Sequence, residues 1–128
     1  MDSLLSILNS TEMDSKAAVI LTGDFKGPPQ EPFYQTVKNK AKLESVFVSA
    51  KGKEPPFTTW SNKMSGDEEK KVTQDYIFFS PSTLSPEAVL WVPKDGEFGE
   101  YLLPNDQYPS DHLSLVTRFK FITIRTMA

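Results

Sequence analysis

The amino-acid sequence predicts an α/β fold, because apolar runs of strand length alternate with segments that have one apolar helical face. The strand-like runs are rich in β-branched and aromatic residues, and Gly and Pro are found in the segments between them. No internal repeat or linker-like tract interrupts this pattern. We therefore expect residues 1–128 to form a single domain.

The first third of the chain predicts a helix, a strand and a second helix. Leu4–Leu8 has an apolar helical face, and the apolar run Ala17–Thr22 is typical of a strand. Pro32 suits the first turn of the second helix, because its fixed φ angle is compatible with that position. The residues that this helix is expected to turn inward are Phe33, Tyr34 and Val37.

The rest of the chain is dominated by strand signals. Phe57–Trp60 and Val72–Phe79 are predicted to be partner strands, joined by the polar loop Ser61–Lys71. The remaining expected elements are a strand at Leu84–Val92 that Pro86 interrupts, a loop at Pro93–Pro109, and a strand at Leu113–Ile124 that closes the sheet.

Three carboxylates and the single histidine lie at the ends of these apolar runs. Asp24 follows the first run, Asp75 begins another, and His112 directly follows Asp111 at the start of the last. Functional side chains often lie at strand ends and in the adjoining loops. These four residues form a candidate site, although a lone histidine beside an apolar run is more often a structural residue.

Three short motifs resemble a known superfamily when they are taken together and in order. They are Gly23-Asp24-Phe25-Lys26, Asp75-Tyr76-Ile77 and Ser110-Asp111-His112. They resemble the GDFN, Asp-Tyr-Ile and SDH motifs of the endonuclease/exonuclease/phosphatase superfamily of metal-dependent phosphodiesterases. Within this superfamily the closer resemblance is to nocturnin and the carbon catabolite repression deadenylases, with Angel and the 2′,5′-phosphodiesterases as near relatives.

The resemblance implies which part of the superfamily fold this chain represents. It corresponds to the second, C-terminal half of a four-layer α/β sandwich, with a mostly antiparallel sheet covered by helices. The first half of the superfamily fold carries a metal-binding glutamate. We therefore expect the chain to need a complementing N-terminal half, or to cover its exposed sheet by forming a homo-oligomer.

The resemblance also implies a role for each motif residue. Asp24 orients or deprotonates the attacking water and helps to hold a magnesium ion, and Asp111 lies near the metal as a ligand or an outer-shell acceptor. His112 contacts the scissile phosphate, and Asp75 accepts a hydrogen bond from His112. The expected substrate is the 3′ end of an RNA or a nucleotide phosphate.

Two further residues have competing interpretations. Lys26 replaces the asparagine of the superfamily motif, and its ammonium group cannot coordinate a cation, so magnesium binding is expected to be weak or absent in this chain alone. Lys26 could pair with a phosphate oxygen or an adjacent carboxylate, or be a surface lysine of a non-catalytic copy. Trp60 could stack on a nucleobase or pack in the core.

Composition excludes several classes of site. The chain has 14 Lys and Arg against 17 Asp and Glu, so its net charge of -3 gives no overall attraction to nucleic acid. The absence of cysteine excludes disulfides and thiolate chemistry, and a single histidine excludes a histidine-rich metal centre. The metal-binding side chains that remain offer mainly oxygen ligands, and these favour a hard cation such as magnesium.

No apolar stretch approaches the roughly 20 residues of a membrane span, and we expect an intracellular, cytoplasmic protein.

Two function hypotheses of different class follow. The chain is either a fragment of a magnesium-dependent phosphodiesterase, inactive without its other half, or a catalytically silent interaction module derived from that fold. The ordered Asp24, Asp75, Asp111 and His112 favour the first hypothesis, and Lys26 favours the second.

Overall fold

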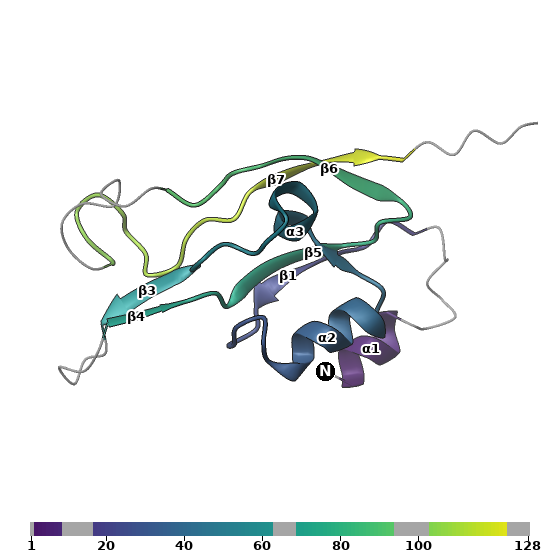
Figure 1. Ribbon diagram of the computed structural model, residues 1–128, viewed down its shortest axis with the longest axis horizontal. Coiled ribbons are helices and arrows are strands. Elements are labelled where there is room, and N and C mark those ends of the chain that lie inside the picture. The colour runs from purple at the N-terminus through teal and green to yellow at the C-terminus, as the bar shows by residue number, and fades with distance from the viewer. Residues whose placement is uncertain (1, 9–16, 63–68, 94–102, 123–128) are drawn as a thin grey trace, which may run out of the picture.

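The computed structural model of the protein describes residues 2–8, 17–62, 69–93 and 103–122 (Figure 1). The helices are α1 (Asp2–Leu8), α2 (Pro32–Asn39) and α3 (Val46–Lys51). The strands are β1 (Ile20–Asp24), β2 (Glu44–Ser45), β3 (Thr59–Asn62), β4 (Glu69–Val72), β5 (Asp75–Phe79), β6 (Leu84–Val89) and β7 (Thr117–Phe121). Helices and strands alternate as far as α3, which confirms the predicted α/β class.

The described strands pair antiparallel and form three small sheets. In the first sheet β5 lies between β1 and the short β2. The second sheet pairs β3 with β4, and the third pairs β6 with β7, with a bulge between Pro86 and Ala88. The predicted antiparallel sheet is therefore present, but it is divided into three parts.

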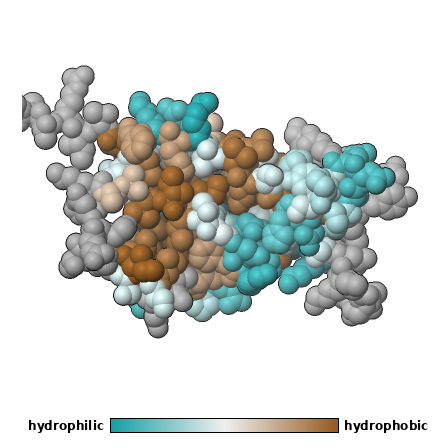
Figure 2. All heavy atoms as spheres, turned by 180° about the vertical axis from the view of Figure 1, so that it is seen from behind, coloured by the Kyte–Doolittle hydropathy of each residue, from teal (hydrophilic) through white to brown (hydrophobic). Residues whose placement is uncertain are grey.

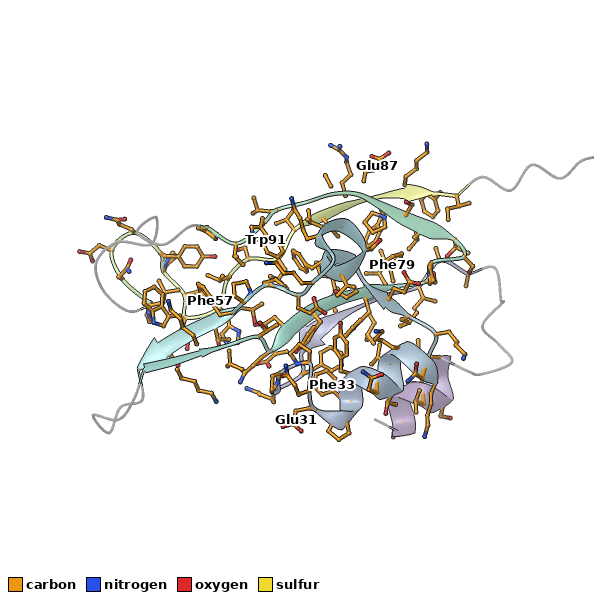
Figure 3. All side chains as sticks on the ribbon, viewed as in Figure 1. Glu31, Phe33, Phe57, Phe79, Glu87 and Trp91 are labelled. Carbon is orange, nitrogen blue, oxygen red and sulfur yellow. The ribbon has the colours of Figure 1, made fainter. Side chains whose placement is uncertain are left out.

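β5 separates two hydrophobic clusters, because successive side chains of a strand point to opposite faces. Tyr76 and Phe78 pack with side chains of α2, whereas Ile77 and Phe79 pack with side chains of α3, β6 and β7. Figure 3 shows Phe33, which belongs to the first cluster, and Phe79 on opposite sides of this strand. β5 is thus the central element against which the helices and the paired strands β6 and β7 pack.

The helices begin and end at residues that suit those positions. α2 has Pro32 in its first turn, as predicted from the sequence. α3 begins after Ser45, whose hydroxyl accepts a hydrogen bond from the Val48 backbone N–H at 3.5 Å, and ends at Gly52 with φ of 78°. Within the described residues, no helix has the length and apolar character needed to cross a bilayer.

The strand predicted at Val72–Phe79 is wrong in one respect, because it is divided into β4 and β5. Two residues between these strands bond to other segments instead of continuing one ladder. The Thr73 hydroxyl donates to the Pro55 carbonyl at 2.6 Å, and the Gln74 N–H donates to the Thr58 hydroxyl at 2.9 Å. As a result β4 pairs with β3, and β5 pairs with β1.

Other predicted strands differ in extent or partner. β7 occupies only part of the predicted run Leu113–Ile124, and it pairs with β6 rather than closing the sheet of β5. β6 ends at Val89, earlier than predicted. β1 starts at Ile20 and is largely exposed, since it forms an edge of its sheet. The parts of predicted elements that fall in residues 63–68, 94–102 and 123–124 lie outside the described residues.

Candidate catalytic site

Two aspartates face each other where β1 ends and β5 begins. Asp24 is the last residue of β1, Asp75 is the first residue of β5, and the antiparallel register pairs them directly. Like charges at directly opposed positions of a strand pair destabilise a sheet. A basic group lies beside each carboxylate, one from the loop after β1 and one from a distant segment.

His112 lies beside Asp75, with its Nδ1 atom 2.9 Å from Asp75 Oδ2. A carboxylate can only accept, so Nδ1 carries the proton in this contact and Nε2 takes no part in it. The backbone of His112 is fixed by a bridge to Thr59 and by its N–H, which donates to the Ser110 hydroxyl at 3.0 Å. The predicted hydrogen bond between Asp75 and His112 is confirmed.

Lys26 contacts both carboxylate oxygens of Asp24. Its backbone N–H donates to Oδ1 at 2.8 Å, and its ammonium group lies 3.2 Å from Oδ2. Of the two predicted partners of Lys26, the structure shows the adjacent carboxylate. The Lys26 side chain is 82% exposed, so this ion pair is well screened by water and adds little stability.

The electrostatic surroundings keep Asp24 ionised. Burial acts to raise the pKa of Asp24, but the hydrogen bonds from the Lys26 backbone and ammonium group lower it, as do the charges of Lys26 and His112. The net pKa of Asp24 therefore lies below its ordinary value. An ionised carboxylate at neutral pH is what a metal ligand or a general base requires.

Asp24, Asp75 and His112 form a group that could hold a metal ion. One potential ligand atom from each of these residues lies within 4.8 Å of the others. Carboxylate oxygens suit a hard divalent cation. The surroundings oppose this in one respect, because Lys26 already pairs with Asp24. The donor set thus fits a divalent ion in part.

Asp111 and Trp60 lie outside this group in the described part of the chain. The carboxylate of Asp111 is not among the clustered ligand atoms. The backbone carbonyl of Asp111 accepts a hydrogen bond from the backbone N–H of Trp60 at 3.0 Å. The Trp60 ring packs edge-on against Phe57 with centroids 6.1 Å apart, and the Lys71 ammonium lies 4.1 Å from its centroid. These contacts match the packing role proposed for Trp60, and its nucleobase role stays a prediction.

Two hydroxyl residues beside the site were not among the sequence candidates. Ser110 accepts the His112 N–H, and this is the short-range pattern by which Ser often fixes a turn, so its spacing could have indicated the role. Thr58 accepts the N–H groups of Gln74 and Asp75 at 2.9 and 3.0 Å. No local signal indicates this second role, since Thr58 is distant in sequence from both donors.

Comparison with known proteins places this geometry in context. No family model matches the chain. The chain is 38% identical to Homo sapiens "Nocturnin" over 122 residues, which is 92% of this chain and 28% of that protein. It is 32% identical to the Arabidopsis thaliana "Carbon catabolite repressor protein 4 homolog 4", covering 88% of this chain and 29% of the relative.

A solved structure shows the same arrangement of elements. The human Nocturnin catalytic domain with bound sulfate anion superposes with a TM-score of 0.66 at 34% sequence identity, over 93% of this chain and 38% of that one. The chain belongs to the endonuclease/exonuclease/phosphatase superfamily, as a nocturnin-like protein matching the C-terminal part of its relatives. The chain spans under a third of the length of the curated nocturnin-like relatives described above, at 28% and 29%.

Proposed function

We propose that the chain is the C-terminal half of a magnesium-dependent phosphodiesterase of the deadenylase-like nuclease type. Its substrate in this proposal is the 3′ end of an RNA or a nucleotide phosphate. The observation that carries the proposal is the meeting of Asp24, Asp75 and His112 from distant parts of the chain, with ligand atoms within 4.8 Å. The nocturnin-like relationship supports the same chemistry.

His112 has the clearest role in this proposal. The contact with Asp75 fixes the ring so that Nε2 is the atom presented to substrate. In its protonated form the ring donates a hydrogen bond from Nε2 to a phosphate oxygen and stabilises the charge that develops there. Asp24, which is ionised, orients the attacking water and accepts its proton.

Asp24 is the proposed magnesium ligand that the clustered donor atoms support. Asp111, whose carboxylate is not among those atoms, is proposed as a second ligand on the resemblance of its motif alone. A bound magnesium ion supplies Lewis-acid stabilisation of the phosphate charge. Asp24 supports this assignment through its ionised state, but its pairing with Lys26 reduces the charge available to a cation. We therefore propose that magnesium binds this chain weakly when it is alone.

We further propose that residues 1–128 form one domain that acts only with a complementing N-terminal half. The larger part of the human Nocturnin catalytic domain has no counterpart in this chain, which covers 38% of it. Catalytic groups that act as a unit lose most of their effect when some are missing. The chain alone is thus expected to be inactive.

The test is release of mononucleotide from a labelled polyadenylate RNA with magnesium. The chain is assayed alone and after mixing with the N-terminal part of a nocturnin-like relative, and each assay is repeated with His112→Ala. Magnesium-dependent release in the mixture that His112→Ala reduces at least about a hundredfold is the expected result. Equal release by the parent and the variant would contradict the assignment of His112.

A second candidate function is a catalytically silent interaction module. Ile20 and Phe121 are 52% and 71% exposed, and Figure 2 shows a broad hydrophobic patch on the face opposite to the view of Figure 1. Exposed apolar patches of this kind promote association with another protein surface. In this alternative the chain binds a second copy of itself, and the mixing assay above shows no release.

A further inference from the structure

We propose that Thr58 is a positioning residue that holds Asp75 and His112 in their mutual orientation. The inference rests on the proposed role of these two residues as the reacting pair. Thr58 is fully buried, with 0% exposure, and lies at the crossing of the two segments that carry the pair. It uses its side chain for one segment and its backbone for the other.

The side chain of Thr58 fixes the segment that leads into Asp75. Its Oγ1 atom accepts the N–H of Gln74 at 2.9 Å and the N–H of Asp75 at 3.0 Å. These two residues lie where the chain passes from β4 to β5, so the strand ladders leave their N–H groups to be satisfied elsewhere. One oxygen thereby sets the orientation of the peptide from which the Asp75 side chain projects.

The backbone of Thr58 fixes the segment that carries His112. Its carbonyl accepts the Leu113 N–H at 2.7 Å, and the neighbouring Thr59 forms a bridge with His112. Its own N–H donates to the Val72 carbonyl at 3.0 Å, which ties the same residue to the end of β4. Thr58 thus bonds both to the segment that leads into Asp75 and to the segment that carries His112.

The chemistry of a hydroxyl group explains why threonine or serine is needed here. A hydroxyl oxygen has two lone pairs and can accept both N–H groups. Valine has nearly the same shape as threonine but accepts neither, so two partly buried donors would lose their partner. Serine keeps the oxygen and loses only a methyl group. This difference allows the positioning role to be separated from packing.

The single histidine of the chain makes the test direct, because its ring gives one set of NMR signals. Three variants, Thr58→Val, Thr58→Ser and Thr59→Val, are compared with the parent across the same pH series, with a chelator present. Long-range 1H–15N correlations report the tautomer of His112. Amide exchange at Gln74 and Asp75, relative to Phe78 in the middle of β5, reports the two N–H bonds.

The parent is expected to have the Nδ1–H tautomer, because Nδ1 donates to Asp75. Thr58→Val should lower that tautomer's population and speed relative exchange at Gln74 and Asp75 at least about tenfold. Thr58→Ser should stay within about twofold of the parent in exchange and keep the tautomer. Thr59→Val is the matched control, since Thr59 is also buried but its hydroxyl donates to Val72, and the tautomer should persist.

Each outcome decides the proposal. Parent-like tautomer and exchange in a folded Thr58→Val would overturn it, as would the same tautomer change in Thr59→Val. If Thr58→Val fails to fold, Thr58→Ser decides: native signals support the role of the oxygen, and their loss refutes it. Failure of RNA cleavage in the mixture with the N-terminal part of a relative would refute the proposed function while leaving these ring and exchange signals unaffected.

Discussion

Lys26 and Lys42 share an unusual backbone conformation, because each has φ of 59° without being glycine. The left-handed region costs most L-residues about 1–2 kcal/mol, and asparagine tolerates it better. Lys26 pairs with Asp24, whereas Lys42 lies at an exposed position after α2. The two lysines therefore differ in electrostatic surroundings but share the same backbone demand.

Replacing Lys26 with asparagine is expected to strengthen divalent-cation binding. Lys26→Asn removes a positive charge 3.2 Å from Asp24 Oδ2 and introduces an amide oxygen that can act as a ligand. We expect the dissociation constant for Mn²⁺, measured by water-proton relaxation, to fall about fivefold to tenfold. Lys42→Asn is the matched control and should leave the dissociation constant for Mn²⁺ unchanged. An unchanged constant in Lys26→Asn would show that Lys26 does not oppose the cation.

The candidate site could be predicted only as far as its motifs extend. The sequence predicts Asp24, Asp75 and His112, because their spacing matches three superfamily motifs and each adjoins an apolar run. The pairing of Lys26 with Asp24 was one of two alternatives that the ammonium chemistry allowed. Asp111 lies outside the ligand group, and spacing along the sequence does not specify which carboxylates meet in space.

At the scale of single elements, α3 shows how a short helix is delimited by its two ends. Ser45 precedes it and accepts the Val48 N–H, and Gly52 ends it in the left-handed region with φ of 78°. A Cβ atom at Gly52 would meet no heavy atom within 4 Å. The preference for glycine is therefore purely conformational.

This gives a prediction for Gly52 that does not involve packing. Gly52→Ala should lower the free energy of unfolding by about 1 kcal/mol, since alanine has to adopt a left-handed φ. Gly52→Asn should lower it less, because asparagine tolerates that region. Urea denaturation followed by circular dichroism measures both. Equal losses in the two variants would point to a cause other than backbone conformation.

The Glu54 side chain links α2 to the residue that precedes α3 through two hydrogen bonds. Its carboxylate accepts the Tyr34 hydroxyl at 2.8 Å and the Ser45 hydroxyl at 2.7 Å. Burial raises the pKa of Glu54, and the hydrogen bonds from Ser45 and Tyr34 and the charge of Lys38 offset this only in part. The folded state thus binds a proton at Glu54 more tightly than the unfolded chain does.

The raised pKa of Glu54 predicts a pH dependence of stability with a definite sign. A carboxyl group with a raised folded pKa stabilises the fold below its unfolded pKa of about 4.3, and this contribution is lost as pH rises through the folded pKa. The parent should therefore lose stability relative to Glu54→Gln as pH increases from about 4. Urea denaturation across that range measures the difference. If the stability of the parent minus that of Glu54→Gln stays constant or rises with pH, the prediction is wrong.

At the scale of the whole molecule, apolar surface is distributed unevenly. Residues of β5 are buried on both faces, whereas Ile20 on β1 and Phe121 on β7 are 52% and 71% exposed. Figure 2 shows a hydrophobic patch on the face opposite to the view of Figure 1. Such a face favours association, since burial of apolar surface is the main driving force for it.

We expect the chain to associate with itself as its concentration rises. Light scattering should give a mass above that of the monomer at high concentration, and Ile20→Lys or Phe121→Lys should shift it toward the monomer by disrupting apolar contact. Lys120→Ser, beside Phe121 on the same strand, is the control and should behave like the parent. A parent that stays monomeric at every concentration would contradict this expectation.

The fold as a whole was predictable in class but not in its division into sheets. Alternating apolar patterns indicated α/β organisation and the helix at Pro32, because both depend on short-range periodicity. The separation of β4 from β5 depends on Thr58 and Pro55, which bond to the intervening residues from across the fold. Such long-range hydrogen bonds cannot be predicted from hydrophobic periodicity in the sequence.

The direct pairing of Asp24 with Asp75 has a consequence for evolutionary change in chain length. Continuous pairing runs from Ile20 opposite Phe79 to Asp24 opposite Asp75. A one-residue insertion or deletion within either strand would move the later side chains to the other face of the sheet and separate the two carboxylates. Surface loops tolerate such changes. We therefore expect length differences among homologous sequences to fall outside Ile20–Asp24 and Asp75–Phe79.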